Sequence, residues 1–148
     1  MGLKGKQAID FSLPDENGKL VSLQDYKGKK LLLVFYPGDN TAVCTKQLCS
    51  YSSGFDGFKN LKIEILGISM DSVESHKKFR EKFKLSFPLL ADLNGKVCEA
   101  YNAKGFFVVK RSTFLIDENQ IIQFENEVLP IFFKDKDEIL DSIKKIIL

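Results

Sequence analysis

The chain has 148 residues, a length typical of one domain and sufficient to bury a hydrophobic core without cross-links. Hydrophobic residues make up 44% of the chain and charged residues 28%, a balance that argues against a disordered protein. The 22 Lys and Arg residues against 20 Asp and Glu give a net charge of +2, and no basic stripe indicates binding to nucleic acid.

The longest uninterrupted apolar run, residues 31–36, is far shorter than the ~20 residues that span a bilayer. The first residues lack the apolar stretch of a signal peptide. We therefore expect no membrane partner and a cytoplasmic location. Three Cys in a chain of this size indicate catalytic, redox-active or buried thiols rather than a disulfide framework, and a single His excludes most multi-His metal sites.

Turn and strand signals alternate in the first half of the chain. Residues 13–18 are typical of a turn, because Pro presets φ and Asn-Gly tolerates positive φ, and residues 19–23 of a short strand. Residues 31–36 are continuously apolar, which predicts a strand buried on both faces, as in parallel sheets. Residues 63–68 form a second run of this kind.

A helix is predicted to follow the second buried strand. Asp71 and Glu74 have the spacing of a capping box, although that box is defined on Ser or Thr at the cap. The helix should run to about Phe83, with Phe79 and Phe83 one turn apart on its inner face. We expect His76, on the same helix, to be a solvated surface residue.

The remaining segments complete an alternating pattern. Residues 87–91 favour an extended piece and residues 96–101 a short helix, while residues 112–116 and 120–124 flank a hairpin signal. An amphipathic helix closes the chain, since apolar residues recur there at helical spacing: Ile139, Leu140, Ile143, Ile146 and Ile147. Together these elements predict one α/β domain over residues 1–148, with a mixed β-sheet flanked by helices.

The segment after the first buried strand contains the strongest candidate for chemistry. Residues 42–48 can form a helix, with Asn40 or Thr41 as the N-cap, and Cys44 would then lie in the first turn. Unpaired N–H groups at a helix start carry partial positive charge and favour the thiolate, the reactive form of Cys. On position alone, a nucleophilic Cys44 and a buried Cys44 acting as a small hydrophobe are equal alternatives.

Cys49 follows five residues later, a spacing that fits neither a Cys-x-x-Cys redox motif nor a metal site. In an intact helix the two Cα atoms would be roughly 8–9 Å apart, beyond the ~7 Å over which a disulfide can form. A disulfide between Cys44 and Cys49 therefore requires local unwinding of the helix. The alternative is that Cys49 only packs inward.

These residues resemble a known family. Pro37, Thr41 and Cys44 match the Pro-x-x-x-Thr-x-x-Cys signature of peroxiredoxins, and the spacing to Cys49 resembles the PrxQ, or bacterioferritin comigratory protein, subfamily. Further segments resemble that subfamily in the same order, namely residues 13–15, 35–37, 67–69, 76–79, 87–92 and 111–117. The resemblance implies a thiol peroxidase on a thioredoxin-like fold.

The resemblance also implies a role for each matching residue. Cys44 would be the peroxidatic residue and Cys49 the resolving one. Thr41 would offer its hydroxyl to the peroxide oxygens as charge develops, and Arg111 would hold a permanent positive charge near the sulfur. Pro37 would shield the site from water. Without the family pattern, Arg111 would be interpreted as a surface cation.

The implied cycle needs a peroxide substrate and a reductant. Cys44 becomes a sulfenic acid, Cys49 condenses with it to an intramolecular disulfide, and an external dithiol then reduces that disulfide. The resemblance implies thioredoxin as the partner, a monomeric protein, and no metal, haem or flavin cofactor.

Some positions depart from the pattern or need their own interpretation. Gln47 stands where the subfamily commonly has Glu, so this position carries no charge, and Ala42-Val43 replaces the usual Pro-Gly. We expect Cys98 to be a partly buried structural thiol, with a resolving role as the minor alternative. Asp39 is expected to cap or brace the active-site loop.

Two other functions remain open from the sequence. One is a non-peroxidatic thiol–disulfide oxidoreductase on the same fold, although the missing Cys-x-x-Cys and the presence of Thr41 count against it. The other is a chaperone-like or redox-sensing protein whose Cys pair only switches conformation. Catalytic consumption of peroxide would separate a peroxidase from both.

Overall fold

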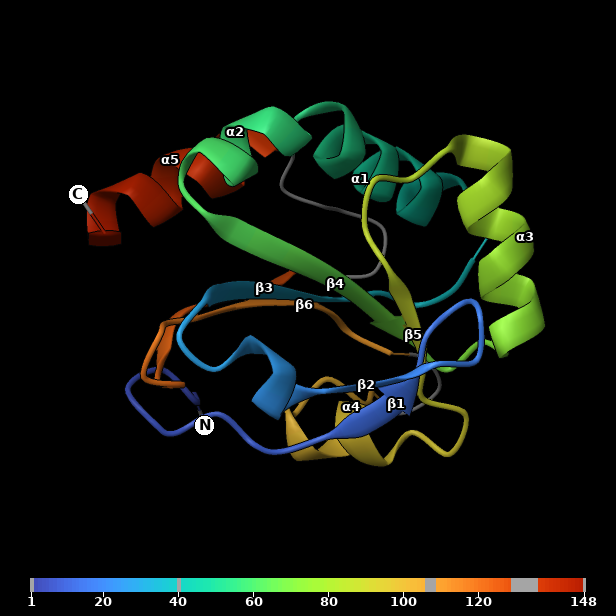
Figure 1. Ribbon diagram of the computed structural model, residues 1–148, viewed down its shortest axis with the longest axis horizontal. Helices are drawn as coiled ribbons and strands as arrows, with labels where there is room; N and C mark the ends of the chain where they lie inside the picture. Colours follow the sequence, from blue (N-terminus) through green and yellow to red (C-terminus); the bar gives the residue numbers. More distant parts are fainter. Residues whose placement is uncertain (1, 40, 106–108, 129–135, 148) are drawn as a thin grey trace.

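The computed structural model describes residues 2–39, 41–105, 109–128 and 136–147 (Figure 1). Its strands are β1 (Ser12–Pro14), β2 (Leu20–Ser22), β3 (Lys30–Phe35), β4 (Ile63–Ser69), β5 (Leu89–Ala91), β6 (Arg111–Ile116) and β7 (Ile122–Val128). Its helices are η1 (Leu23–Tyr26, a 3-10 helix), α1 (Ala42–Ser53), α2 (Phe55–Asn60), α3 (Val73–Phe83), α4 (Lys96–Ala100) and α5 (Lys136–Ile147).

Five strands form a mixed sheet in the order β5-β4-β3-β6-β7. β3 pairs in parallel with β4, and β4 with β5, whereas β6 runs antiparallel to both β3 and β7. β1 and β2 form a separate antiparallel pair. The predicted mixed sheet and the predicted hairpin are therefore both present, and the continuously apolar segment is the central strand β3.

Each face of the sheet has its own hydrophobic core, because successive side chains of a strand point to opposite faces. Leu31 and Leu33 of β3 pack with the side chains of β1, β2 and α4. Leu32 and Val34 pack on the other face, with buried residues of α1, α2, α3 and α5. Figure 1 shows these two layers, with α1, α2 and α5 above the sheet and α4 with the β1–β2 pair below it.

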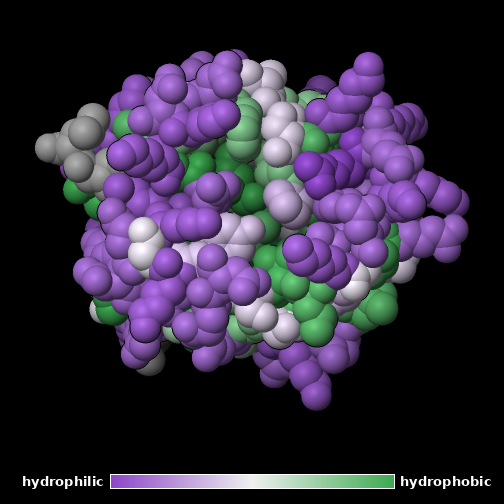
Figure 2. All heavy atoms as spheres, viewed as in Figure 1, coloured by the Kyte–Doolittle hydropathy of each residue, from purple (hydrophilic) through white to green (hydrophobic). Residues whose placement is uncertain are grey.

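The outer surface is largely polar. On the face drawn in Figure 2, hydrophilic side chains cover much of the surface, and hydrophobic ones gather toward the middle and lower part. In the part of the chain that the structure describes, no helix has both the length and the hydrophobicity that a bilayer crossing requires.

Helix α1 is longer than predicted. The sequence suggested that it ends near Leu48, because Ser and Gly are poor helix formers. In the structure it continues through Ser53, and α2 follows directly. Tertiary packing overrides propensity here, since Tyr51 is fully buried and its ring contacts Phe58 of α2 with centroids 5.9 Å apart.

Helix α3 ends at Phe83 as predicted, but its start differs. The N-cap is Ser72, whose hydroxyl accepts a hydrogen bond from the Ser75 N–H, and not Asp71. The Asp71 carboxylate instead accepts hydrogen bonds from the Ser69 hydroxyl and from the N–H of Asp39. Asp71 is therefore used in tertiary contacts that a local sequence pattern does not reveal.

The closing helix α5 is amphipathic as predicted. Ile139, Leu140 and Ile143 are buried, and Ile146 is 38% exposed. The side chain of Ile147 lies outside what the structure describes.

Candidate active site

The candidate site lies at the carboxyl end of β3, where the chain turns into α1. Thr41 is the N-cap of α1, with extended backbone angles (φ −80°, ψ 148°), and its hydroxyl donates to the Gly38 carbonyl at 3.2 Å. Asn40, the other N-cap candidate, lies outside the described residues. The Thr41 side chain makes no capping hydrogen bond, so it leaves free the amides of the first turn, which include those of Val43 and Cys44.

Cys44 is the third residue of α1 and is fully buried. Arg111, the first residue of β6, is also buried, and its Nη2 lies 3.2 Å from the Cys44 Sγ. The antiparallel pairing of β6 with β3 explains this contact, since Ser112 is opposite Phe35 at the carboxyl end of β3. The guanidinium is always charged, so its N–H group is a charge-assisted hydrogen-bond donor to the sulfur.

Gln47 holds the guanidinium from its other side. Its Oε1 accepts a hydrogen bond from Arg111 Nη1, and its Nε2 donates to the Tyr51 hydroxyl at 3.3 Å. Gln47 lies one turn after Cys44 on α1 and is 1% exposed. The neutral amide thus orients Arg111 without adding a negative charge next to the sulfur.

Cys49 lies on the same helix and is partly buried. Burial raises the pKa of its thiol above the ordinary value. All three Cys are free thiols in this structure, and α1 is continuous through both Cys44 and Cys49. The geometry is therefore that of a reduced protein in which an intact helix separates the two sulfur atoms.

His76 is not the solvated residue that the sequence suggested. It is completely buried, with Nδ1 2.8 Å from Asp39 Oδ2 and Nε2 2.9 Å from the Leu90 carbonyl oxygen. A local signal was present, because His76, Phe79 and Phe83 share one face of the helix at i, i+3 and i+7. Asp39 braces the active-site loop, since its side chain contacts α3 and its N–H bonds to Asp71.

Asp39, Asp71 and His76 are the one group of potential metal ligands found among the described residues, with ligand atoms within 4.8 Å of one another. Their polar atoms already hydrogen-bond within the protein: Asp39 accepts from the Tyr36 hydroxyl at 2.7 Å and from Ser75, and Asp71 from Ser69. This arrangement is that of a hydrogen-bonded network and gives no reason to assign a metal.

Cys98 is fully buried in α4, more deeply than the partial burial expected from the sequence. Its N–H donates to Asp92 Oδ2 at 2.8 Å. Burial and, next, the Asp92 carboxylate raise the pKa of the Cys98 thiol well above its ordinary value. Such a thiol stays protonated and does not suit a resolving role.

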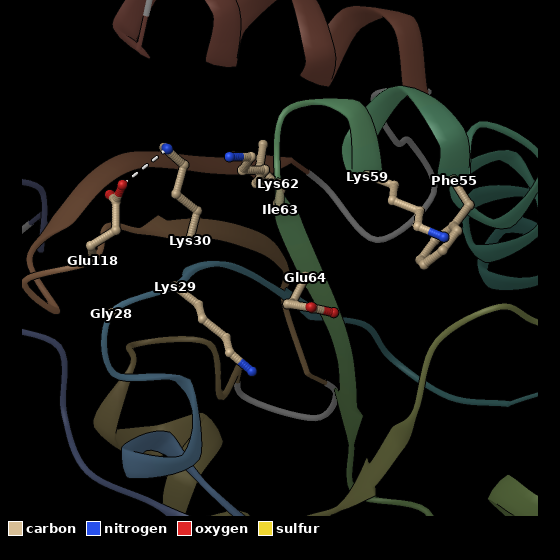
Figure 3. Close-up of a pocket in the computed structure, with 9 residues that line it drawn as sticks. All are labelled: Gly28, Lys29, Lys30, Phe55, Lys59, Lys62, Ile63, Glu64 and Glu118. Atoms are coloured by element: carbon tan, nitrogen blue, oxygen red, sulfur yellow. Dashed lines mark hydrogen bonds and ion pairs between the residues drawn. The ribbon is translucent and has the colours of Figure 1, made fainter.

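A second concave region lies at the opposite end of β3. This pocket of about 480 Å³ is lined by Lys29 and Lys30 before and at the start of β3, by Phe55 and Lys59 of α2, and by Lys62 (Figure 3). Glu118 also lines it and pairs with Lys30 at 3.1 Å. The pocket contains none of the residues expected in the site, and the length of β3 places it ~20 Å away from Cys44.

Comparison with known proteins agrees with this geometry. Residues 4–125 match the AhpC/TSA family. The chain is 38% identical to peroxiredoxin Bcp of Bacillus subtilis, over 95% of this chain and 92% of that protein. It is also 38% identical to the chloroplastic peroxiredoxin Q of rice (Oryza sativa subsp. japonica), over 82% of this chain but only 57% of that protein.

Solved structures show the same likeness. Peroxidoxin BcpB of Mycobacterium tuberculosis superposes with a TM-score of 0.89 at 29% identity, covering 99% of each chain. The bacterioferritin comigratory protein of Xanthomonas campestris, whose structures concern alkyl peroxide reduction, gives a TM-score of 0.82 at 27% identity, over 91% of this chain and 90% of that one. The predicted thioredoxin-like fold is thereby confirmed.

The chain therefore belongs to the AhpC/TSA family and, within it, to the peroxiredoxins of the Bcp or Q type. The predicted class of enzyme, a thiol peroxidase, is confirmed by this membership.

Proposed function

We propose that this peroxiredoxin reduces hydrogen peroxide and organic hydroperoxides with Cys44 as the peroxidatic residue. The observation that supports this assignment best is the 3.2 Å contact between Arg111 Nη2 and Cys44 Sγ, with both residues buried. Of the three Cys, Cys44 is the one with a guanidinium at its sulfur, whereas burial raises the pKa of both Cys49 and Cys98.

In the first step the Cys44 thiolate attacks one oxygen of the peroxide, and the O–O bond breaks. Sulfur gains that oxygen as sulfenic acid, and the other oxygen leaves as water or an alcohol after taking up a proton. The N–H groups of the first turn of α1 and Arg111 supply donors for the charge that develops on oxygen. The Thr41 hydroxyl donates to Gly38 in the resting structure, so donation to a peroxide requires it to rotate.

Pro37 is partly buried directly before the loop that contains Thr41, where it would limit access of water to the sulfur. Cys44 itself has no exposed surface, so entry of a peroxide requires a local movement of the surrounding side chains.

In the second step the Cys49 thiol condenses with the Cys44 sulfenic acid, which releases water and forms a disulfide. An intact α1 keeps the two residues too far apart for this bond. The helix therefore unwinds locally when the disulfide forms. A dithiol reductant, which we propose to be thioredoxin, returns the two Cys to thiols and becomes a disulfide itself.

The monomeric state, the cytoplasmic location and the single-domain organisation remain predictions from the sequence. Light scattering coupled to size-exclusion chromatography tests the first of them. A mass of one chain is expected in both the reduced and the oxidised protein.

The decisive experiment is peroxide-dependent NADPH consumption with thioredoxin and thioredoxin reductase. Wild type should turn over catalytically, and Cys44→Ser should fall to the uncatalysed background because no other thiol has a cation at its sulfur. Cys98→Ser is the matched control and should retain turnover. Substantial turnover by Cys44→Ser would refute the assignment of Cys44, and absence of turnover in wild type would refute the proposed cycle.

A further inference from the structure

The loop between β3 and α1 is anchored at Asp39 on all sides. Its N–H donates to Asp71 Oδ2 at 2.8 Å. Its Oδ1 accepts from the Tyr36 hydroxyl at 2.7 Å, and its Oδ2 accepts from the Ser75 hydroxyl at 2.7 Å and lies 2.8 Å from His76 Nδ1. Asp39 thus joins the end of β3, the segment after β4 and helix α3 to the loop that begins the active site.

His76 links Asp39 to the sheet as a buried hydrogen-bonded pair. Its Nε2 lies 2.9 Å from the Leu90 carbonyl oxygen, which can only accept, so Nε2 is the donor there. Its Nδ1 lies 2.8 Å from Asp39 Oδ2 and 3.4 Å from the Tyr36 hydroxyl. The side chains of His76 and Asp39 are 0% and 1% exposed, so the pair is shielded from water.

Asp39 lies two residues before Thr41, the N-cap of α1, and five residues before Cys44. The Thr41 hydroxyl bonds to Gly38, the neighbour of Asp39, so the position of this loop sets the position of Thr41 and of the first helical turn. None of these network atoms is a contact of Cys44 Sγ in the structure, where Arg111 occupies that place. The network therefore acts through the loop and not on the sulfur.

We propose that His76 and Asp39 are positioning residues for the peroxide step: the buried pair holds residues 37–39 in place so that the donors of Thr41 and of the α1 start meet the peroxide oxygens. The inference rests on the proposed function of Cys44. It separates two properties of the site, since Arg111 makes the sulfur nucleophilic and the Asp39 network aligns the donors for the leaving oxygen.

That separation gives a test in which two reagents probe the same sulfur. A hydroperoxide needs both the thiolate and the aligned donors, whereas iodoacetamide needs only an accessible thiolate. In His76→Leu the rate constant for oxidation of Cys44 by cumene hydroperoxide, followed by rapid quench and mass spectrometry, should fall ~10- to 100-fold, the size expected for a small misalignment. The rate of Cys44 alkylation should not fall with it, because Arg111 is unchanged and a looser loop leaves the sulfur at least as accessible as in wild type.

Conservative variants distinguish positioning from a loss of folding. His76→Asn retains an amide that can donate to Asp39, and it should restore part of the peroxide rate lost in His76→Leu. Ser75→Ala removes one donor to Asp39 at a partly buried site and should lower the peroxide rate ~3- to 10-fold even if His76→Leu does not fold. Lys78→Ala, on the same helix but exposed and paired with Glu74 instead of Asp39, is the matched control and should behave as wild type.

Two results would overturn the inference, and a different result would refute the proposed function. The inference would be overturned if Ser75→Ala and either folded His76 variant reacted with peroxide at the same rate as Lys78→Ala. It would also be overturned if peroxide and alkylation rates fell in parallel, because the network would then serve only the fold or the thiolate. Wild-type Cys44 that fails to react with peroxide would instead refute the proposed function.

Discussion

Two buried cysteines of this protein occupy nearly equivalent places in their helices but have neighbouring side chains of opposite charge. Cys44 is the third residue of α1, Cys98 is the third residue of α4, and both are fully buried. At Cys44 a guanidinium nitrogen contacts the sulfur, and the Thr41 side chain at the N-cap makes no hydrogen bond to the first N–H groups of the helix. At Cys98 the Asp92 carboxylate accepts the N–H groups of Val97 and Cys98.

The difference shows that a position near a helix start does not by itself make a thiol reactive. Helix α4 has the same partial positive charge at its start, but Asp92 takes up its amide donors and adds a negative charge beside the thiol. Helix α1 leaves its amides available and receives a cation from β6. We therefore propose that the charge of the neighbouring side chain decides which of the two cysteines is the nucleophile.

Replacing Arg111 tests whether its charge causes the difference between Cys44 and Cys98. Arg111→Ala should lower the rate constant of Cys44 with hydrogen peroxide ~10²- to 10³-fold, since both thiolate formation and stabilisation of the leaving oxygen lose a charge. Arg111→Lys should recover only part of that rate, because Lys lacks the planar guanidinium whose two nitrogens donate to Cys44 and Gln47 at the same time. Stopped-flow competition with a reference peroxidase measures these rates.

Lys110→Ala is the matched control, since Lys110 is an exposed neighbour paired with Glu127 and should leave the rate unchanged. Gln47→Glu sharpens the comparison, because it places a carboxylate beside Arg111, much as Asp92 lies beside Cys98. We expect its rate constant with hydrogen peroxide to lie between those of wild type and Arg111→Ala. Wild-type kinetics in Arg111→Ala would show that Arg111 has only a structural role.

A second prediction asks which cysteine resolves the sulfenic acid. One equivalent of peroxide should join Cys44 to Cys49 within one chain, with partial loss of far-UV helical signal and faster amide exchange over residues 42–53. Cys49→Ser should react once, stall as sulfenic acid and overoxidise under excess peroxide, so its steady-state turnover should fall at least ~10-fold while the first oxidation keeps its rate. Peptide mapping and hydrogen-exchange mass spectrometry measure both effects.

Cys98→Ser should form the same disulfide as wild type in that experiment. A disulfide between Cys44 and Cys98, or between two chains, would contradict the resolving role of Cys49. An unchanged helical signal after oxidation would contradict the unwinding of α1.

The smallest expected effect concerns Cys98 and appears in stability. Cys98→Ala should lower the free energy of unfolding at pH 7 by about 1 kcal/mol. Because burial and Asp92 raise its pKa, the thiol stays protonated in the folded protein, while in the unfolded chain it ionises above about pH 8.5. The stability that this difference contributes is present below about pH 8.5 and is lost as the pH rises further.

Urea unfolding of wild type and Cys98→Ala at pH 7 and pH 10 checks this prediction. The gap between the two proteins should narrow at pH 10, because only wild type loses stability through this thiol. A gap that is the same at both pH values would show that Asp92 and burial do not hold the proton on Cys98.

Much of the fold could be predicted because its signals are local. The apolar runs identify β3 and β4, the Asp-Glu-Asn turn identifies the β6–β7 hairpin, and Thr41 before Cys44 identifies the start of α1. The end of α1 and the existence of α2 were missed, because these serine- and glycine-rich segments are helical only through burial of Tyr51 and Phe58. Propensity alone does not report such packing.

The site was partly predictable for the same reason. Helix position left two equal alternatives for Cys44, and the resemblance decided between them. The place of Arg111 also followed from the resemblance, because 67 residues separate it from Cys44 and only strand pairing brings them together. His76 was misinterpreted as exposed, since its partners Asp39 and Leu90 lie 37 and 14 residues away. Contacts at such separations depend on tertiary structure and leave no spacing pattern.

The continuous helix α1 also has a consequence for the reduction potential of the enzyme. The proposed disulfide between Cys44 and Cys49 requires α1 to unwind, so every contact that stabilises α1 would stabilise the reduced protein and make that disulfide more oxidising. The burial of Tyr51 and the bond from the Lys136 N–H to the Ser50 hydroxyl at 3.1 Å are contacts of this kind. About 1.4 kcal/mol of helix stability corresponds to roughly 30 mV, so side chains that never meet the sulfur set how readily a reductant restores it.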